Sequence, residues 1–242
     1  MLYFLIFMIG ACAGSFANVI LTRKDWYKGR SRCDTCGYTL KWFDLIPIIS
    51  YLSLRGRCRK CGTKIGFEHL LSECYMGFAF LSISYIFEAY GVLLAVIAGT
   101  GIVFLCLAAI EDFKEHEVSV WILLCGMVFL LYERIIWVII TRDLIHCAGI
   151  ITCVLIIFCI GTVSNRKWSD FIGAGDFDLM IIMILTLGAY NFAIAITLSS
   201  VIGLCIYLPI ILFKRNDYKM QMPFGPLLYV GSMTVLLLCG IS

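Results

Sequence analysis

The chain has 242 residues, of which 62% are hydrophobic and only 14% are charged, and its mean hydropathy is +0.97. A composition this apolar excludes an ordinary soluble domain and predicts an all-α polytopic membrane protein. The formal net charge is +3, and the positions of the basic residues along the chain predict the topology.

Eight apolar stretches are long enough to cross a bilayer as helices. They lie at residues 2–21, 70–87, 92–110, 120–140, 144–163, 171–190, 192–213 and 224–241. Very short connections, such as 88–91, predict tight hairpins between neighbouring helices. No basic residue precedes the first stretch, so we expect a retained helix and not a cleaved signal peptide.

Most of the nineteen Lys and Arg residues lie at 22–69, between the first two predicted spans. This places the loop in the cytoplasm and the N-terminus outside. With alternating spans, every other basic residue except Arg134 and Arg142 also falls on the cytoplasmic side. Nucleic acid is an alternative partner for a basic loop. The topology and contact with anionic lipid headgroups explain the charge more simply, so we expect the lipid bilayer and no nucleic acid as partner.

The cytoplasmic loop contains four cysteines in two pairs, each with two intervening residues: Cys33, Cys36, Cys58 and Cys61. Two such pairs complete a tetrahedral four-sulfur site suited to zinc, in a zinc-ribbon-like module. A glycine follows each pair, at Gly37 and Gly62, as a sharply turning metal-binding loop requires. The reducing cytoplasm disfavours disulfides. Because four sulfurs leave no open position, we expect the zinc to be structural.

Several polar or small residues lie in or beside the first two spans. Gly14 and Ser15 suit close helix packing, with a direct substrate role as the alternative, and Asn18 is a candidate hydrogen-bonding anchor. Glu73 is either a solvated or lysine-paired carboxylate at the membrane surface or a polar site residue.

Two aspartates lie at the ends of apolar stretches. Asp176 follows Gly173-Ala174-Gly175, about one helical turn into such a stretch, where an ionisable side chain is costly in lipid and marks a site. Asp112 follows the third span, and the topology brings both aspartates to the cytoplasmic surface. Three other carboxylates share the acidic turn with Asp112, and composition does not choose among them: Glu111, Glu115 and Glu117.

Together these motifs resemble those of the type IV prepilin peptidase family, a family of membrane aspartic proteases with a Gly-x-Gly-Asp motif. The resemblance covers almost the whole chain. It rests on Gly14 to Val19, the two cysteine pairs, Trp42 to Pro47, Leu54 to Cys58, Glu73, Asp112, the motif at 173–176, and Pro223 to Pro226.

The resemblance implies an endopeptidase with Asp112 and Asp176 as the catalytic pair. It would remove a basic leader from type IV prepilins or pseudopilins at the cytoplasmic face of the bacterial inner membrane. The chain would then consist of a first membrane helix at 1–21, the zinc-binding loop at 22–69 and a seven-helix protease core at 70–242. The resemblance also implies N-methylation of the new N-terminus with S-adenosylmethionine, but it identifies no donor-binding residue. The chain departs from the family pattern at Ser119, where proline is usual, and at Asp178, where lysine is usual; these positions bear on substrate detail and rate.

Two other functions would use membrane aspartates. A presenilin-like protease shares the Gly-x-Gly-Asp motif but cuts within the membrane, whereas both aspartates here are predicted at its surface. A transporter would carry polar residues near the midplane of several spans, whereas this chain keeps its acidic residues almost entirely at span ends.

Overall fold

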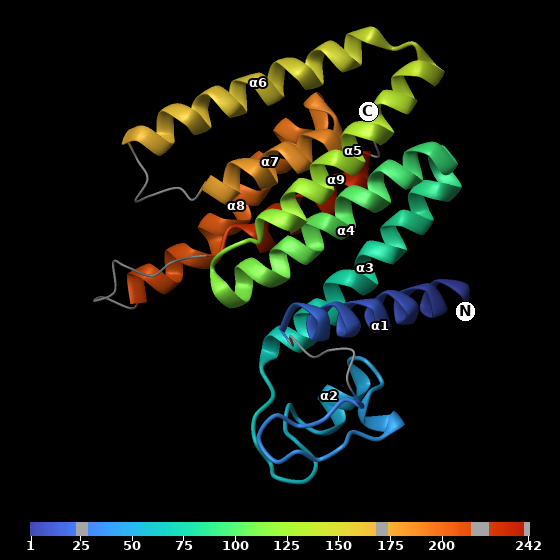
Figure 1. The fold of residues 1–242 in the computed structure, drawn as a ribbon, viewed down its shortest axis with the longest axis vertical. Helices are drawn as coiled ribbons and strands as arrows, with labels where there is room; N and C mark the ends of the chain where they lie inside the picture. The colour runs from blue at the N-terminus through green and yellow to red at the C-terminus, as the bar shows by residue number, and fades with distance from the viewer. Residues whose placement is uncertain (23–28, 168–173, 214–222, 240–242) are drawn as a thin grey trace. The chain divides into compact units, whose positions relative to one another are not determined.

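A computed structural model describes residues 1–22, 29–167, 174–213 and 223–239 (Figure 1). The regular elements of these residues are all helices, with two isolated β-bridges in the loop that follows the first helix, so the predicted all-α class is confirmed. Gly173, the first residue of the Gly-x-Gly-Asp motif, lies outside the described residues. The chain forms two compact units, Met1–Leu81 and Ser82–Ser242.

Each predicted apolar stretch corresponds to a helix. The elements are α1 (Leu2–Thr22), η1 (Trp42–Asp44), α2 (Ile49–Ser53), α3 (Phe67–Tyr90), α4 (Val92–Glu115), α5 (Val120–Thr141), α6 (Leu144–Lys167), α7 (Ala174–Leu187), α8 (Ala189–Phe213) and α9 (Gly225–Cys239). Within the described residues, six of them are long and apolar enough to cross a membrane: α1, α3, α4, α5, α6 and α8. α7 has 14 described residues and α9 has 15, so the number of eight full spans stays a prediction.

In the first unit, α1 packs closely against the beginning of α3. A side chain at Gly10 would meet the backbone oxygen of Met76 at 2.5 Å, and one at Gly14 would collide with the backbone of Ser72. Glycines spaced four residues apart let two helix backbones approach in this way. The packing role predicted for Gly14 is therefore confirmed.

The anchoring role of Asn18 is also confirmed. Its side chain is 1% exposed and its Nδ2 donates to Ser72 Oγ at 2.8 Å. The same nitrogen lies 3.0 Å from His69 Nδ1. Because both partners lie on α3, this buried amide joins the two helices where they leave the apolar region.

In the second unit, α7 is the central helix. It packs against α4, α5, α6, α8 and α9, and every residue from Ile182 to Leu187 is buried. A helix that is apolar on all sides is buried either among other helices or in lipid, and α7 is buried among other helices. The stretch that follows the Gly-x-Gly-Asp motif is thus the core of the unit.

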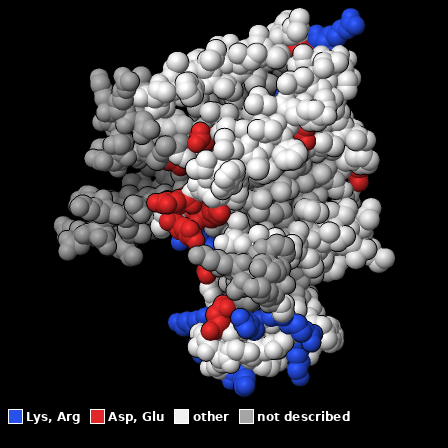
Figure 2. Space-filling view, viewed as in Figure 1, with Lys and Arg blue, Asp and Glu red and all other residues white. Residues whose placement is uncertain are grey.

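The helices around α7 expose large apolar side chains. Only 11% of the apolar window of α6 and 17% of that of α8 is buried. On the face shown in Figure 2, the second unit is mostly uncharged apart from one group of Asp and Glu side chains, whereas the Lys and Arg side chains of the first unit gather on its loop. So much exposed apolar surface requires lipid contact, and the protein is a multi-pass membrane protein.

Two helix ends differ from the predicted boundaries. The stretch predicted at 171–190 is interrupted at Gly188, which adopts φ +84° and ends α7 at Leu187. Only glycine adopts such a φ without strain. α4 continues past the predicted end at 110 to Glu115, and His116 ends it with φ +54°. Asp112 therefore belongs to the last turn of a helix and not to the loop that follows it.

Arg134, which the topology assigned to the outer side, is buried within α5 at 6% exposure. Its Nε donates to the carbonyl of Leu185 at 2.6 Å and its Nη2 to that of Thr186 at 2.9 Å. The last carbonyls of a helix have no intrahelical donor. The buried Arg134 side chain therefore satisfies the C-terminal end of α7.

We expect Arg134→Met to lower the free energy of unfolding by about 1–3 kcal/mol, because two buried carbonyls lose a charged donor. Thermal unfolding of the purified protein in detergent measures this loss. Arg142→Gln is the matched control, since Arg142 is exposed and its replacement should leave the melting temperature unchanged. Equal melting temperatures for Arg134→Met and the wild type would contradict the proposed capping.

Candidate active site and metal centre

Asp112 lies on the last turn of α4 and is 7% exposed. Its Oδ2 accepts a hydrogen bond from the N–H of Gly225 at 2.6 Å. Gly225 is the first residue of α9, so its N–H has no acceptor within that helix. A Cβ at this position would lie 3.0 Å from Asp112 Oδ2 and 3.3 Å from Ala109 Cα. The site therefore requires glycine in order to bring a backbone donor this close to the carboxyl group.

The other carboxylates of the acidic turn lie in different environments. Glu111 Oε2 accepts the N–H of Ser119 at 2.8 Å, and Ser119 is the residue that precedes α5. Glu115 and Glu117 are exposed. Among these four carboxylates, Asp112 alone is buried, which distinguishes it in a way that the sequence did not.

Asp176 lies in the first turn of α7 and is partly buried. A side chain on the preceding Gly175 would meet no described atom within 4 Å. Among the described residues, no atom therefore occupies the place of a side chain at Gly175. Asp178, on the same helix, is also partly buried.

The register of α4 against α7 relates the two aspartates. The helices run in opposite directions (Figure 1), and they meet where the Thr186 side chain fills the place that a side chain of Gly101 would take. Asp112 follows Gly101 by eleven residues and Asp176 precedes Thr186 by ten. At a rise of 1.5 Å per residue, Asp112 lies about 16 Å along α4 from this contact and Asp176 lies about 15 Å along α7 from it. Because the helices are antiparallel, both displacements point toward the same end of the pair. The register therefore sets the two carboxyl groups at nearly the same height.

The four cysteines of the first unit lie together, and their Sγ atoms are all within 4.8 Å of one another. Sγ of Cys33 and Sγ of Cys61 are 3.9 Å apart, close to the spacing of about 3.8 Å that zinc–sulfur bonds of ~2.3 Å impose in a tetrahedron. The predicted cluster is confirmed as a group that could hold a metal ion.

The two cysteine turns repeat the same local geometry. In each, the N–H of the glycine donates to the carbonyl of the first cysteine at 2.9 Å, from Gly37 to Cys33 and from Gly62 to Cys58. The glycines adopt φ +66° and +71°, the sharp turn expected for them. Isolated bridges at Arg32 and Thr39 and at Arg57 and Lys64 flank the two turns.

The thiols of the cluster ionise together only when a cation offsets their negative charge. The hydrogen bond with Thr63 lowers the pKa of the Cys61 thiol to about 6. The N–H of Tyr38 lowers the pKa of Cys36, but burial and the neighbouring thiols outweigh it and raise that pKa to about 11. Adjacent thiolates repel one another, so all four ionise together only around a divalent ion.

Sequence reasoning missed the ion pair that joins this cluster to the rest of the loop. Arg59, between the second pair of cysteines, donates through Nε to Asp44 Oδ1 at 2.8 Å, and its guanidinium lies 4.9 Å from the Phe43 ring centroid. Burial opposes ionisation of Asp44, but the bonds from Arg59 and from the Lys41 N–H outweigh it and lower its pKa. The signal was present in the Trp42 to Pro47 motif, which places an aspartate among apolar residues.

Comparison with known proteins gives two family matches that together cover most of the chain. Residues 8–87 match the bacterial peptidase A24 N-terminal domain, and residues 99–208 match the type IV leader peptidase family. The second match contains both aspartates and the first contains the four cysteines. The chain belongs to the type IV leader peptidase family. The resemblance inferred from the motifs is thereby confirmed.

The chain is similar to several proteins named prepilin leader peptidase/N-methyltransferase. The Myxococcus xanthus (strain DK1622) protein is 41% identical over 81 residues, which is 32% of this chain and 24% of the relative. A Burkholderia pseudomallei (strain 1026b) protein is 28% identical over 213 residues, 86% of this chain and 66% of the relative. The chain thus matches less than two thirds of the length of these two relatives.

The Bacillus subtilis (strain 168) relative of the same name is 26% identical over 242 residues, which is 95% of this chain and 91% of the relative. No solved structure matches the chain.

We expect the wild-type protein to contain about one zinc ion per chain and Cys58→Ser to contain almost none, because three sulfur ligands hold a structural zinc poorly. Elemental analysis of the purified protein measures the zinc content. Cys12→Ser is the matched control, because Cys12 is exposed on α1. A full zinc content in Cys58→Ser would show that this cysteine is not a ligand.

Proposed function

We propose that this protein removes the basic leader peptide from type IV prepilins or pseudopilins by aspartic protease chemistry, with Asp112 and Asp176 as the catalytic pair. The observation that carries the proposal is the register of α4 against α7, which sets both aspartates at one end of the pair. The buried carboxyl of Asp112, oriented by the N–H of Gly225, supports it further. So does the match of 99–208 to the type IV leader peptidase family.

The proposed chemistry requires the two carboxyl groups to lie close together. Two adjacent carboxylates do not both ionise cheaply, so one retains a proton. The ionised group takes a proton from the attacking water while the protonated group donates to the peptide carbonyl, and the roles reverse as the amine leaves. The two groups titrate as one unit, so acid and base are not assigned to single residues. In this proposal the substrate backbone and water would approach on the side of Gly175, where no described atom lies within 4 Å of an added Cβ.

The membrane setting gives this chemistry its location. We place the pair at the cytoplasmic face of the bacterial inner membrane, with the N-terminus outside and eight membrane-crossing helices, of which 70–242 form the protease core. Support comes from the Lys and Arg residues concentrated in the loop after α1. The leader of a membrane-inserted prepilin, cut where it leaves the bilayer, would meet the aspartates at this surface.

Two further elements complete the proposal. A zinc ion held by the four cysteines would stabilise the fold of the loop, since four sulfur ligands leave no open position for catalysis. The protein would also methylate the new N-terminal amine with S-adenosylmethionine, which the names of the relatives support.

Replacing either aspartate by asparagine preserves its shape and removes its acid-base function. We expect Asp112→Asn and Asp176→Asn each to lower the rate of prepilin cleavage roughly a thousandfold or more. Purified protein and a prepilin from the same genome, with mass spectrometry of the product, measure the rate.

Asp178→Asn is the matched control for this experiment, since Asp178 lies on the same helix as Asp176 but about 200° around its axis, and it should cleave normally. Full cleavage by either of the first two variants would exclude that residue from the pair.

Gly225→Ala tests the placement of Asp112. The added methyl group would press on Asp112 and Ala109, so we expect cleavage to fall about tenfold, equivalent to ~1.4 kcal/mol of transition-state stabilisation, with zinc content unchanged. Gly99→Ala is the control, because a Cβ there meets only Ile83 at an ordinary 3.5 Å. Cleavage at the wild-type rate in Gly225→Ala would show that the position of Asp112 does not depend on this contact.

A further inference from the structure

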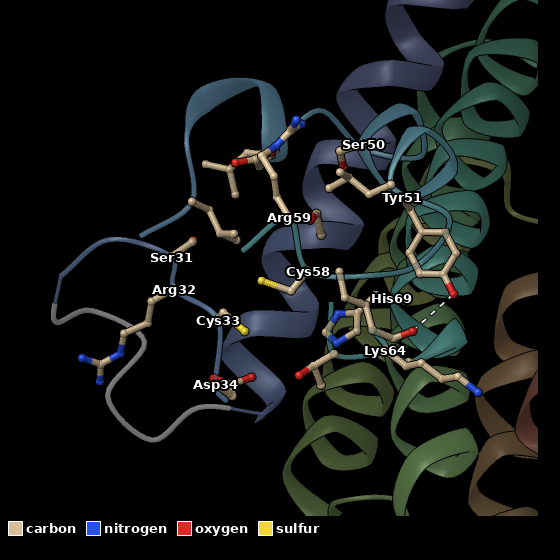
Figure 3. A pocket seen from close by; sticks show the side chains of 18 of the residues that line it. Ser31, Arg32, Cys33, Asp34, Ser50, Tyr51, Cys58, Arg59, Lys64 and His69 are labelled. Atoms are coloured by element: carbon tan, nitrogen blue, oxygen red, sulfur yellow. Dashed lines mark hydrogen bonds and ion pairs between the residues drawn. The ribbon is translucent and has the colours of Figure 1, made fainter. Parts of the chain in front are cut away.

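The first unit contains a cavity of about 450 Å³, within the size range of sites for small molecules. Its lining residues come from α1, from the loop and from the beginning of α3, all within the first unit. Figure 3 shows the side chains of Cys58, Arg59 and His69 around it. None of its lining residues belongs to the segment that matches the type IV leader peptidase family. The cavity therefore lies in a different part of the chain from both aspartates.

Glu73 is a buried carboxylate in the wall of this cavity, 9% exposed on α3. Its Oε2 accepts the N–H of Ile48 at 2.7 Å, and the Ser15 side chain also hydrogen-bonds to it. The reading of Glu73 as a solvated carboxylate is therefore wrong. A buried acidic group held in one orientation by two donors is typical of a binding site.

The backbone that orients Glu73 is strained. Ile48 adopts φ +63° and ψ −52°, and the N–H of Ile49 donates to the carbonyl of Pro47 at 2.6 Å. This is the rare γ-turn with positive φ, here at a β-branched residue. Strained turns persist where the surroundings hold them, and they occur preferentially at ligand sites. The turn directs the N–H of Ile48 to Glu73.

The cavity wall presents charges of both signs beside apolar surface. Four carboxylates and three basic groups line it: Asp34, Asp44, Glu68, Glu73, Arg32, Arg59 and Lys64. Arg59 is already engaged with Asp44. Tyr51, whose hydroxyl donates to the carbonyl of Ile65 at 3.3 Å (Figure 3), presents an aromatic ring on the same wall.

We propose that this cavity binds S-adenosylmethionine and that Glu73 is the anionic group facing its sulfonium. The inference rests on the proposed methyl transfer and assigns it to the first unit. The donor combines a cationic sulfur, an amino-acid zwitterion and an adenosine. The fixed carboxylate of Glu73 suits the cationic sulfur, and charges of both signs suit the amino-acid zwitterion. An aromatic ring with apolar side chains suits the adenosine.

The reaction that such a donor supports is balanced without another reagent. The lone pair of the neutral N-terminal amine forms the new nitrogen–carbon bond as the carbon–sulfur bond breaks with its electron pair on sulfur, and the amine releases one proton to solvent. Glu73 is a donor-binding residue in this scheme, and no proton transfer is assigned to it.

The test measures binding of radiolabelled S-adenosylmethionine to the full chain in detergent by equilibrium dialysis. We expect Glu73→Gln to weaken binding at least tenfold while leader cleavage and zinc content stay unchanged. Glu88→Gln, an exposed position on the same helix, and Asp112→Asn should both bind the donor like the wild type. Wild-type affinity in a folded Glu73→Gln variant would overturn the assignment.

A second measurement covers the case in which Glu73→Gln does not fold. Ultraviolet crosslinking of the labelled donor to the wild-type protein, followed by peptide mapping, should place the label within residues 15–73. A label within 99–208 would overturn the proposed site. Absence of donor binding to the wild type would overturn both this site and the proposed methylation, while prepilin cleavage, measured separately, would still decide the proposed protease activity.

Discussion

The close antiparallel packing of α7 against α4 is the contact on which the second unit depends. It requires Gly101, because the side chain of Thr186 fills the space beside it. α7 is enclosed by its neighbouring helices. Because its described residues end in the core, its last carbonyls must be satisfied there. Arg134 satisfies them at one end. The other end carries Asp176, so the packing that buries the helix also sets the height of the aspartate.

The first unit depends on a different kind of restraint, a series of short polar contacts. The cysteine turns hold Arg59, Arg59 binds Asp44, and the chain that follows Asp44 leads within a few residues to the strained turn at Ile48. That turn donates to Glu73 on α3. A metal ion at the cysteines would therefore stabilise a cavity wall as well as a loop. In this arrangement a closed metal site contributes to function through position and not through chemistry.

Much of this organisation was predictable because its signals are local. Apolar length predicted a helix at each of eight stretches, paired cysteines predicted a cluster, and Gly14 predicted a close helix contact. Predictions at helix ends were weaker. Gly188 divides one apolar run into two helices through its backbone conformation, which hydropathy does not register, and Asp112 lies within a helix that continues past its last apolar residues.

By itself, the sequence determined that the chain is helical, embedded in a membrane and equipped with four clustered cysteines, because composition and spacing carry that information. The family followed from the resemblance of its motifs to those of known proteins. Only the tertiary structure decided that Asp112 is buried while Glu111 binds the backbone of Ser119. It alone showed that Arg134 binds the end of α7 and that Glu73 faces a cavity. These outcomes depend on which groups distant in the chain meet one another, and no local pattern of residues specifies such meetings.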